Sequence, residues 1–180
     1  STLWVVDLAY VEFADSDPTP MVLKLPNVVV VRTLSKGWGL AGLRLGITLA
    51  SPEVARTLQA AGSPYPVSQL SLDAAVAAID DEKSMLAGVQ EVQAERVALQ
   101  QVLRACDMNP LPSASNFVMA DTSESLKATW VRDGCAALGV GVRLFAGRKG
   151  LERSVRISCP GDAGAFARLT STLAAVCRPQ

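Results

Sequence analysis

The sequence predicts an α/β protein, in which part of a parallel-sheet domain is followed by a long connecting helix and a smaller α/β domain. The run Val28–Val31 is β-branched without alternation, which is typical of a strand buried on both faces of a parallel sheet. Residues 82–106 carry apolar side chains at steps of three and four, as a long amphipathic helix requires. From about residue 113 onward, short strand-like and helix-like segments alternate. We therefore expect domain boundaries at 1–80, 81–112 and 113–180.

The first part of the chain predicts three strands separated by loops. An apolar run over residues 3–6 ends at Asp7 and forms the first strand. Residues 11–26 contain three prolines and two aspartates, which favours a loop. Residues 27–34 contain the valine run, and residues 43–50 predict a further strand after a glycine-rich turn.

Helical signals follow. Ser51 is a candidate N-cap, Pro52 stands at the first helical position and Gly62 ends this helix. Residues 63–68 form a rigid link with two prolines, and residues 69–79 predict an alanine-rich helix. The long amphipathic helix then ends at Asn109-Pro110, and the expected later elements are strands at 116–120, 140–145 and 154–158 and helices at 124–138 and 162–176.

The composition excludes several classes of chemistry. The chain of 180 residues has no histidine, so it cannot by itself build a Ser-His-Asp triad, a Cys-His pair or a histidine-ligated metal site. Its 17 basic and 17 acidic residues cancel, which removes the electrostatic argument for nucleic acid or an anionic membrane as a partner. Hydrophobic residues make up 49% and charged residues 19%, as in a folded chain.

The four cysteines, at 106, 135, 159 and 177, show no C-x-x-C spacing and lie in apolar runs. We expect them to be small buried side chains in a reducing compartment, not disulfides or metal ligands. The longest unbroken apolar run is too short to cross a membrane. No signal-peptide pattern precedes the first strand. We therefore expect a cytoplasmic protein without a metal.

The segment from Arg32 to Gly46 carries the chemistry, and two interpretations of it are weak. Gly37, Gly39 and Gly42 match G-x-G-x-x-G, but a dinucleotide site needs a following helix and an acidic residue about 20 positions on, and neither is predicted. A Ser35-Lys36 catalytic pair is disfavoured, because adjacent side chains of an extended segment point to opposite faces.

The third interpretation is a nucleophilic lysine that binds an aldehyde cofactor. Lys36 follows a buried strand, at the edge where open α/β sheets bind ligands, and desolvation there would activate its amine. Arg44 could bind an anion. Asp7 ends an earlier strand, and Tyr10 follows it. A surface lysine beside a glycine-rich hairpin explains the residues alone equally well.

The sequence resembles the pyridoxal-phosphate-dependent class I/II aminotransferases of fold type I, and most closely the histidinol-phosphate aminotransferases. The resemblance extends over almost the whole chain, and the lysine segment with its arginine is the most specific part. The matching segments are Val-Asp-Leu-Ala-Tyr-Val-Glu-Phe at 6–13, the segment 32–46, Pro-Tyr-Pro-Val-Ser at 64–68, Ser-Asn-Phe-Val at 115–118, Gly-Val-Arg at 141–143 and Val-Arg-Ile-Ser at 155–158. The implied fold is part of the large-domain sheet of these enzymes followed by their small C-terminal domain.

The resemblance implies pyridoxal 5'-phosphate as the cofactor and a role for each residue near the lysine. Lys36 would carry the cofactor covalently and move the proton between the substrate and the cofactor. Asp7 would pair with the pyridine nitrogen and Tyr10 would bond the ring 3-hydroxyl. Ser35 and Arg44 would hold the phosphate.

The resemblance also implies substrate-binding residues. Arg156 would bind the acidic group of the substrate, Arg143 is a second candidate for the same anion, and Asn116 would line the site. The alternatives are surface ion pairs for the two arginines and a backbone-bridging role for Asn116. Thr33 is a weaker phosphate candidate and otherwise a plain strand residue, and Trp38 is expected to pack.

The implied reaction moves an amino group from a small-molecule donor to an oxo acceptor. Members of this family are about twice as long, so the chain would be a C-terminal half. The other half supplies a phosphate loop, a stacking ring and a tyrosine lent across a homodimer. This sequence departs from the family at Leu8, at Gly37, where alanine is common, and at Cys159-Pro160. The rival interpretations are a decarboxylase of amino-acid phosphates with the same fold, and a catalytically incompetent fragment.

Overall fold

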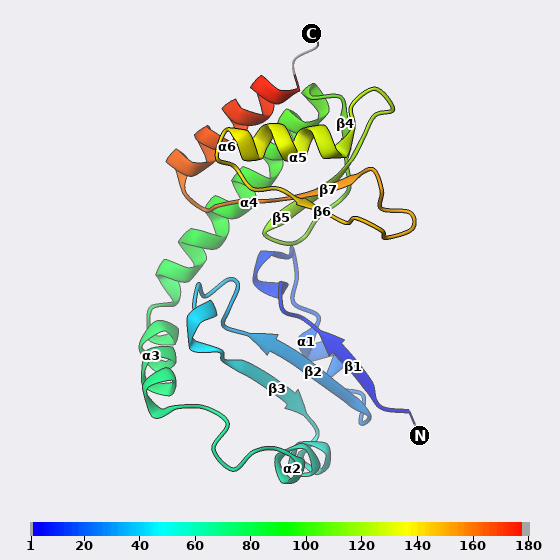
Figure 1. The fold of residues 1–180 in the computed structure, drawn as a ribbon. Coiled ribbons are helices and arrows are strands. Elements are labelled where there is room, and N and C mark those ends of the chain that lie inside the picture. The colour runs from blue at the N-terminus through cyan, green and yellow to red at the C-terminus, as the bar shows by residue number, and fades with distance from the viewer. Residues whose placement is uncertain (1, 178–180) are drawn as a thin grey trace. The chain divides into compact units, whose positions relative to one another are not determined.

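The computed structural model describes residues 2–177 (Figure 1). The chain forms two compact units, one reaching to Val89 and the other starting at Gln90. The long helix α4 (Glu82–Ala105) contributes residues to both units. Within the described residues, none of the helices combines the length and the apolar character that a membrane crossing requires.

The first unit is built on a sheet of three strands in the order β1-β2-β3. The strands are β1 (Trp4–Asp7), β2 (Val28–Thr33) and β3 (Gly46–Ala50). β1 and β2 run parallel, whereas β2 and β3 run antiparallel. The sequence prediction of a buried parallel strand is therefore correct for β2, whose first three valines are buried, but β3 makes the sheet a mixed one.

The turn before β3 differs from the sequence prediction. Arg44 has a φ of 56°, in the left-handed region, and a single 3₁₀ turn, η2 (Ala41–Leu43), precedes it. The strand expected from residue 43 therefore begins only at Gly46, because a left-handed residue breaks the extended backbone.

The loop predicted over residues 11–26 contains two short helical turns, η1 (Val11–Phe13) and α1 (Thr19–Val22). The remaining helices of this unit lie where the sequence predicts them, at α2 (Pro52–Ala61) and α3 (Gln69–Asp80). The predicted N-cap of α2 is confirmed, since the Ser51 hydroxyl accepts a hydrogen bond from the Val54 amide at 3.4 Å.

The second unit contains an antiparallel sheet in the order β4-β5-β7-β6. Its strands are β4 (Met108–Pro110), β5 (Phe117–Thr122), β6 (Arg143–Leu144) and β7 (Ser154–Ser158), and its helices after α4 are α5 (Ala128–Ala137) and α6 (Ala163–Val176). Three predictions need correction. Asn109-Pro110 lies in an edge strand and does not merely end the helix, α5 starts four residues later than expected (128 against 124), and the strand predicted at 140–145 has two residues.

The core of the second unit is formed by residues that recur at the strand period in β5 and at the helix period in α4. β5 alternates, with Val118, Ala120 and Thr122 buried on one face. α4 contributes Leu99 and Leu103, which are completely buried four residues apart on one side of the helix. The predicted apolar stripe of the long helix is thus confirmed as a core face.

Candidate active site

The strand directions of the first unit place two predicted site residues at one edge of its sheet. Asp7 is the last residue of β1, and Lys36 follows the end of β2 by three residues (36 − 33). Because β1 and β2 are parallel, both residues lie at the carboxyl edge, where ligands of α/β sheets bind. Pairing continues past the strand end, since the Leu8 amide donates to the Val31 carbonyl at 2.8 Å.

Two of the predicted side chains at this edge are in contact. The Lys36 ammonium lies 5.4 Å from the centre of the Tyr10 ring, within the range of a cation–π contact. The Asp7 carboxylate is oriented by the Ala9 amide, which donates to its Oδ1 at 3.0 Å. The Lys36 amine therefore lies against the Tyr10 ring, and the Asp7 carboxylate is at the end of the neighbouring strand. Both Lys36 and Asp7 are exposed, so the desolvation of the lysine expected from the sequence is not observed.

The predicted phosphate ligands lie on the turn that carries the lysine. The Ser35 amide donates to the Thr33 hydroxyl at 3.1 Å, and that hydroxyl donates to the Leu45 carbonyl at 3.0 Å. The Thr33 side chain therefore acts as a bridge within the turn. Arg44 is exposed and donates from Nη1 to the Ala41 carbonyl at 2.9 Å, within its own turn.

The glycine-rich turn does not form a dinucleotide site. The chain makes one 3₁₀ turn, which contains Gly42, and then enters β3, antiparallel to β2. No α-helix begins there to offer its N-terminus to a pyrophosphate, so the dinucleotide interpretation is wrong. Trp38 packs against a small core of Leu34, Leu45 and Ala75, as expected.

The predicted substrate residues form a second group, in the second unit. Arg156 on β7 stands directly opposite Arg143 on β6, so both side chains leave the same face of the sheet. The Arg156 guanidinium stacks on the Phe117 ring at 5.0 Å. Its Nε is buried and has no hydrogen-bond partner among the residues that the structure describes.

This arrangement does not support the surface ion-pair alternative for the two arginines. Neither Arg143 nor Arg156 forms a salt bridge within residues 2–177. Like charges directly opposite each other on a sheet are unfavourable, and an anion between them would remove that cost. Asn116 immediately precedes β5, and its main-chain carbonyl accepts from the Cys159 amide at 2.9 Å, a contact that any residue could make.

Sequence reasoning assigned no role to several charged residues that are buried or half-buried. Glu12 and Arg32 form an ion pair at 2.9 Å near the lysine turn. Glu95 and Arg96 of α4 are 6% and 8% exposed and bind the backbone of two loops in the second unit. Charged residues are normally exposed, and only the tertiary structure shows that these are buried.

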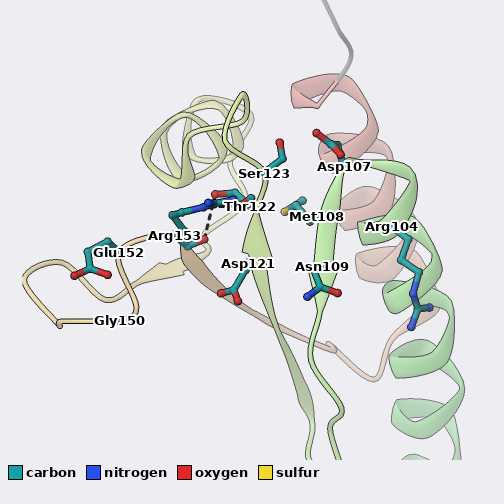
Figure 2. Close-up of a pocket in the computed structure, with 10 residues that line it drawn as sticks. All are labelled: Arg104, Asp107, Met108, Asn109, Asp121, Thr122, Ser123, Gly150, Glu152 and Arg153. Carbon is teal, nitrogen blue, oxygen red and sulfur yellow. Dashed lines mark hydrogen bonds between the residues drawn. The ribbon is translucent and has the colours of Figure 1, made fainter.

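The second unit also has a polar hollow of about 660 Å³ at one end of its sheet (Figure 2). Arg153 lies across it and donates from Nε to the Thr122 carbonyl at 2.9 Å. Asp107 and Asp121 also line it, whereas none of the predicted site residues does. The hollow is therefore a separate feature from the candidate site.

A family model described as aminotransferase class I and II matches residues 1–172 of this chain. The chain belongs to this family. It is 40% identical over 116 residues to the histidinol-phosphate aminotransferase of Syntrophotalea carbinolica, covering 64% of this chain and 33% of that enzyme. An aromatic amino acid aminotransferase of Mycobacterium sp. (strain KMS) is 40% identical over 126 residues, covering 68% of this chain and 35% of that protein.

A solved aminotransferase structure has the same fold. The histidinol-phosphate aminotransferase of Sinorhizobium meliloti, in complex with pyridoxal-5'-phosphate, is 30% identical, with a TM-score of 0.86. The alignment covers 98% of this chain and 49% of that one, so the chain spans about half the length of this aminotransferase. The fold-type-I architecture predicted from the sequence is confirmed by this similarity.

Proposed function

We propose that this chain is the lysine-bearing part of a pyridoxal-phosphate-dependent transaminase. The observation that carries the proposal is the placement of Asp7 and Lys36 at the carboxyl edge of β1 and β2, with the Lys36 ammonium against the Tyr10 ring. These donors fit the cofactor, since an amine can bind its aldehyde and a carboxylate can hold its protonated ring nitrogen. When bound, pyridoxal phosphate supplies an electron sink for the substrate α-carbon.

Each residue then has a defined task. Lys36 would hold the cofactor covalently and, once the substrate amine displaces it, would move the proton between the substrate α-carbon and the cofactor. Asp7 keeps the ring nitrogen protonated, and Tyr10 donates to the ring 3-hydroxyl oxygen. Ser35 and Arg44 bind the phosphate, for which the Arg44 side chain leaves the Ala41 carbonyl that it contacts here.

The substrates are a small amino donor and an oxo acceptor, at least one of which carries an anionic group. Arg156 and Arg143 bind this anion, and Asn116 contributes beside them. The mutual repulsion of the two opposed arginines supports this assignment, as does the buried Nε of Arg156, which has no hydrogen-bond partner in the part of the chain that the structure describes. We assign the histidinol-phosphate type, with 2-oxoglutarate as the acceptor, because aminotransferases of that name recur among its relatives.

We infer further that the chain acts in the cytoplasm as part of a homodimeric enzyme of greater length. The division into a part of the large domain (1–80), a connecting helix (81–112) and a small domain (113–180) belongs to the same proposal.

The first test is the covalent binding of pyridoxal phosphate. The chain is mixed with the cofactor, its visible absorbance is recorded, and the linkage is reduced with borohydride and located by peptide mass spectrometry. We expect modification at Lys36, loss of the band in Lys36→Ala, and retention of it in the matched exposed-lysine variant Lys24→Ala. A band that survives in Lys36→Ala overturns the assignment.

The second test separates activity from cofactor binding. Histidinol phosphate with 2-oxoglutarate, and in a separate reaction an amino-acid phosphate, are added to the loaded chain, and the products are identified. Amino-group transfer supports the transaminase, whereas release of carbon dioxide supports the decarboxylase. Cofactor binding without either product supports the incompetent-fragment interpretation.

A further inference from the structure

Glu12 lies close to the proposed lysine site and has no role in the function described so far. It belongs to the 3₁₀ turn η1, two residues after Tyr10, and its side chain is only 7% exposed. A buried carboxylate is costly unless charged or hydrogen-bonding partners compensate it, so its position calls for a physical reason.

Arg32 holds this carboxylate through one of its oxygens. Arg32 on β2 donates from Nη2 to the Glu12 Oε1 at 2.9 Å and from Nη1 to the Asp17 Oδ2 at 3.1 Å. Burial opposes ionisation of Asp17, but hydrogen bonds from Thr19 and the charge of Arg32 hold its pKa below the ordinary value. Arg32 thus ties the loop after β1 to the strand that leads to the lysine.

The Glu12 side chain contacts the backbone beside Lys36. A Cβ added at Gly37 would lie 2.7 Å from the Glu12 Cβ and 2.9 Å from its Cγ, closer than real carbon atoms approach. Glycine at residue 37 therefore allows the lysine segment to lie directly against Glu12. The Tyr10 ring contacts the Lys36 ammonium from the same turn.

We propose that Glu12 is a positioning residue for Lys36. Its methylene groups support the Lys36-Gly37 backbone, and its ion pair with Arg32 holds it there, so the lysine amine is presented at the carboxyl edge of the sheet. This inference rests on the proposed role of Lys36 as the cofactor lysine.

The test measures how fast Lys36 reacts with pyridoxal phosphate in the full 180-residue chain. The amine adds to the aldehyde and water leaves, so the rate at several cofactor concentrations gives an association constant and a maximal rate. Glu12→Gln removes the charge but keeps the shape. Asp15→Asn is the matched control, because Asp15 is an exposed acid of the same loop.

If Glu12 positions Lys36, its replacement should change the maximal rate of the reaction and leave the association constant for pyridoxal phosphate unchanged. In Glu12→Gln the maximal rate at Lys36 should fall about fivefold or more, as for the loss of one ion pair, with the association constant unchanged. Asp15→Asn and modification of Lys24 should match the wild type. An unchanged maximal rate in Glu12→Gln overturns the positioning role and leaves the proposed function standing.

If Glu12→Gln does not fold, a second variant tests whether Glu12 positions Lys36. Gly37→Ala forces a methyl group against Glu12 and should also lower the maximal rate at Lys36, whereas a wild-type rate there refutes the contact. If Lys36 of the wild type is not modified at all, the proposed function itself is refuted. This result differs from an unchanged rate in Glu12→Gln or in Gly37→Ala, which refutes only the positioning role.

Discussion

Glu95 gives the sharpest prediction for the second unit. It is 6% exposed in the middle of α4, and its two carboxylate oxygens accept from the Gly161 amide at 2.8 Å and the Asp162 amide at 3.1 Å. Asp162 is the N-cap of α6, where its Oδ1 accepts from the Ala165 amide at 2.7 Å. Glu95 therefore joins the long helix to Gly161 and to Asp162, the residue that caps α6.

The size of the effect follows from these contacts. Hydrogen bonds to a charged group contribute roughly 1.5–3 kcal/mol each, and burial of the carboxylate offsets part of the total. We expect Glu95→Ala to lower the free energy of unfolding by about 3 kcal/mol. Glu95→Gln can accept only one of the two bonds and should lose about half as much.

The pH dependence has a definite sign. Burial raises the pKa of Glu95, with help from the nearby Glu91 and Asp162 carboxylates and against the two amide hydrogen bonds. The folded chain therefore binds this proton more tightly than the unfolded chain does. The contribution of Glu95 to stability is then greatest at low pH and declines as pH rises from the ordinary carboxyl pKa through the raised one. Glu95→Gln should remove this decline.

Urea unfolding followed by circular dichroism, at several pH values, measures these differences. Hydrogen exchange at the Gly161 and Asp162 amides should become faster in the variants, because these amides lose their bonds to Glu95. Glu91→Ala is the matched control, an exposed glutamate one turn earlier on the same helix. Equal destabilisation by Glu95→Ala and Glu91→Ala would refute the reasoning.

Three further predictions concern single residues. Burial raises the pKa of Cys159 to about 12, so iodoacetamide at pH 8 should modify it at least about a hundredfold more slowly in the folded than in the unfolded chain, as mass spectrometry can measure. Leu99→Ala should cost about 2–5 kcal/mol in urea unfolding, because the side chain is completely buried. Gly161→Ala should cost about 1–2 kcal/mol in thermal unfolding, since Gly161 has a φ of 67° and its added Cβ would lie 3.1 Å from the Val92 Cγ2.

The elements predicted well are those that local physics determines. The valine run of β2 and the apolar stripe of α4 each have one compatible structure, and Ser51 caps α2 through its own hydroxyl. The elements predicted poorly depend on distant partners. β4 contains Pro110, which argues against a strand, but it lies at a sheet edge where a missing amide does no harm.

The candidate site also contains some features that the local sequence predicts and others that depend on distant partners. The strand-end positions of Asp7 and Lys36 could be read from the sequence, because parallel strands bring their carboxyl ends to one edge. The opposed arginines could not, since their register depends on the pairing of β6 with β7. Nor could the burial of Glu12, because an acidic residue in a loop is normally solvated.

The two groups of site residues can be tested independently. Under the proposed function, covalent modification would require Lys36 in the first unit, whereas anion binding would require Arg143 and Arg156 in the second. Opposed guanidinium groups repel each other until an anion neutralises them, so replacing Arg143 should stabilise the second unit while weakening its affinity for an anion. If the two arginines form an anion site, replacing Arg143 changes both stability and anion affinity. If Arg143 is a surface arginine without a ligand, the replacement changes stability alone.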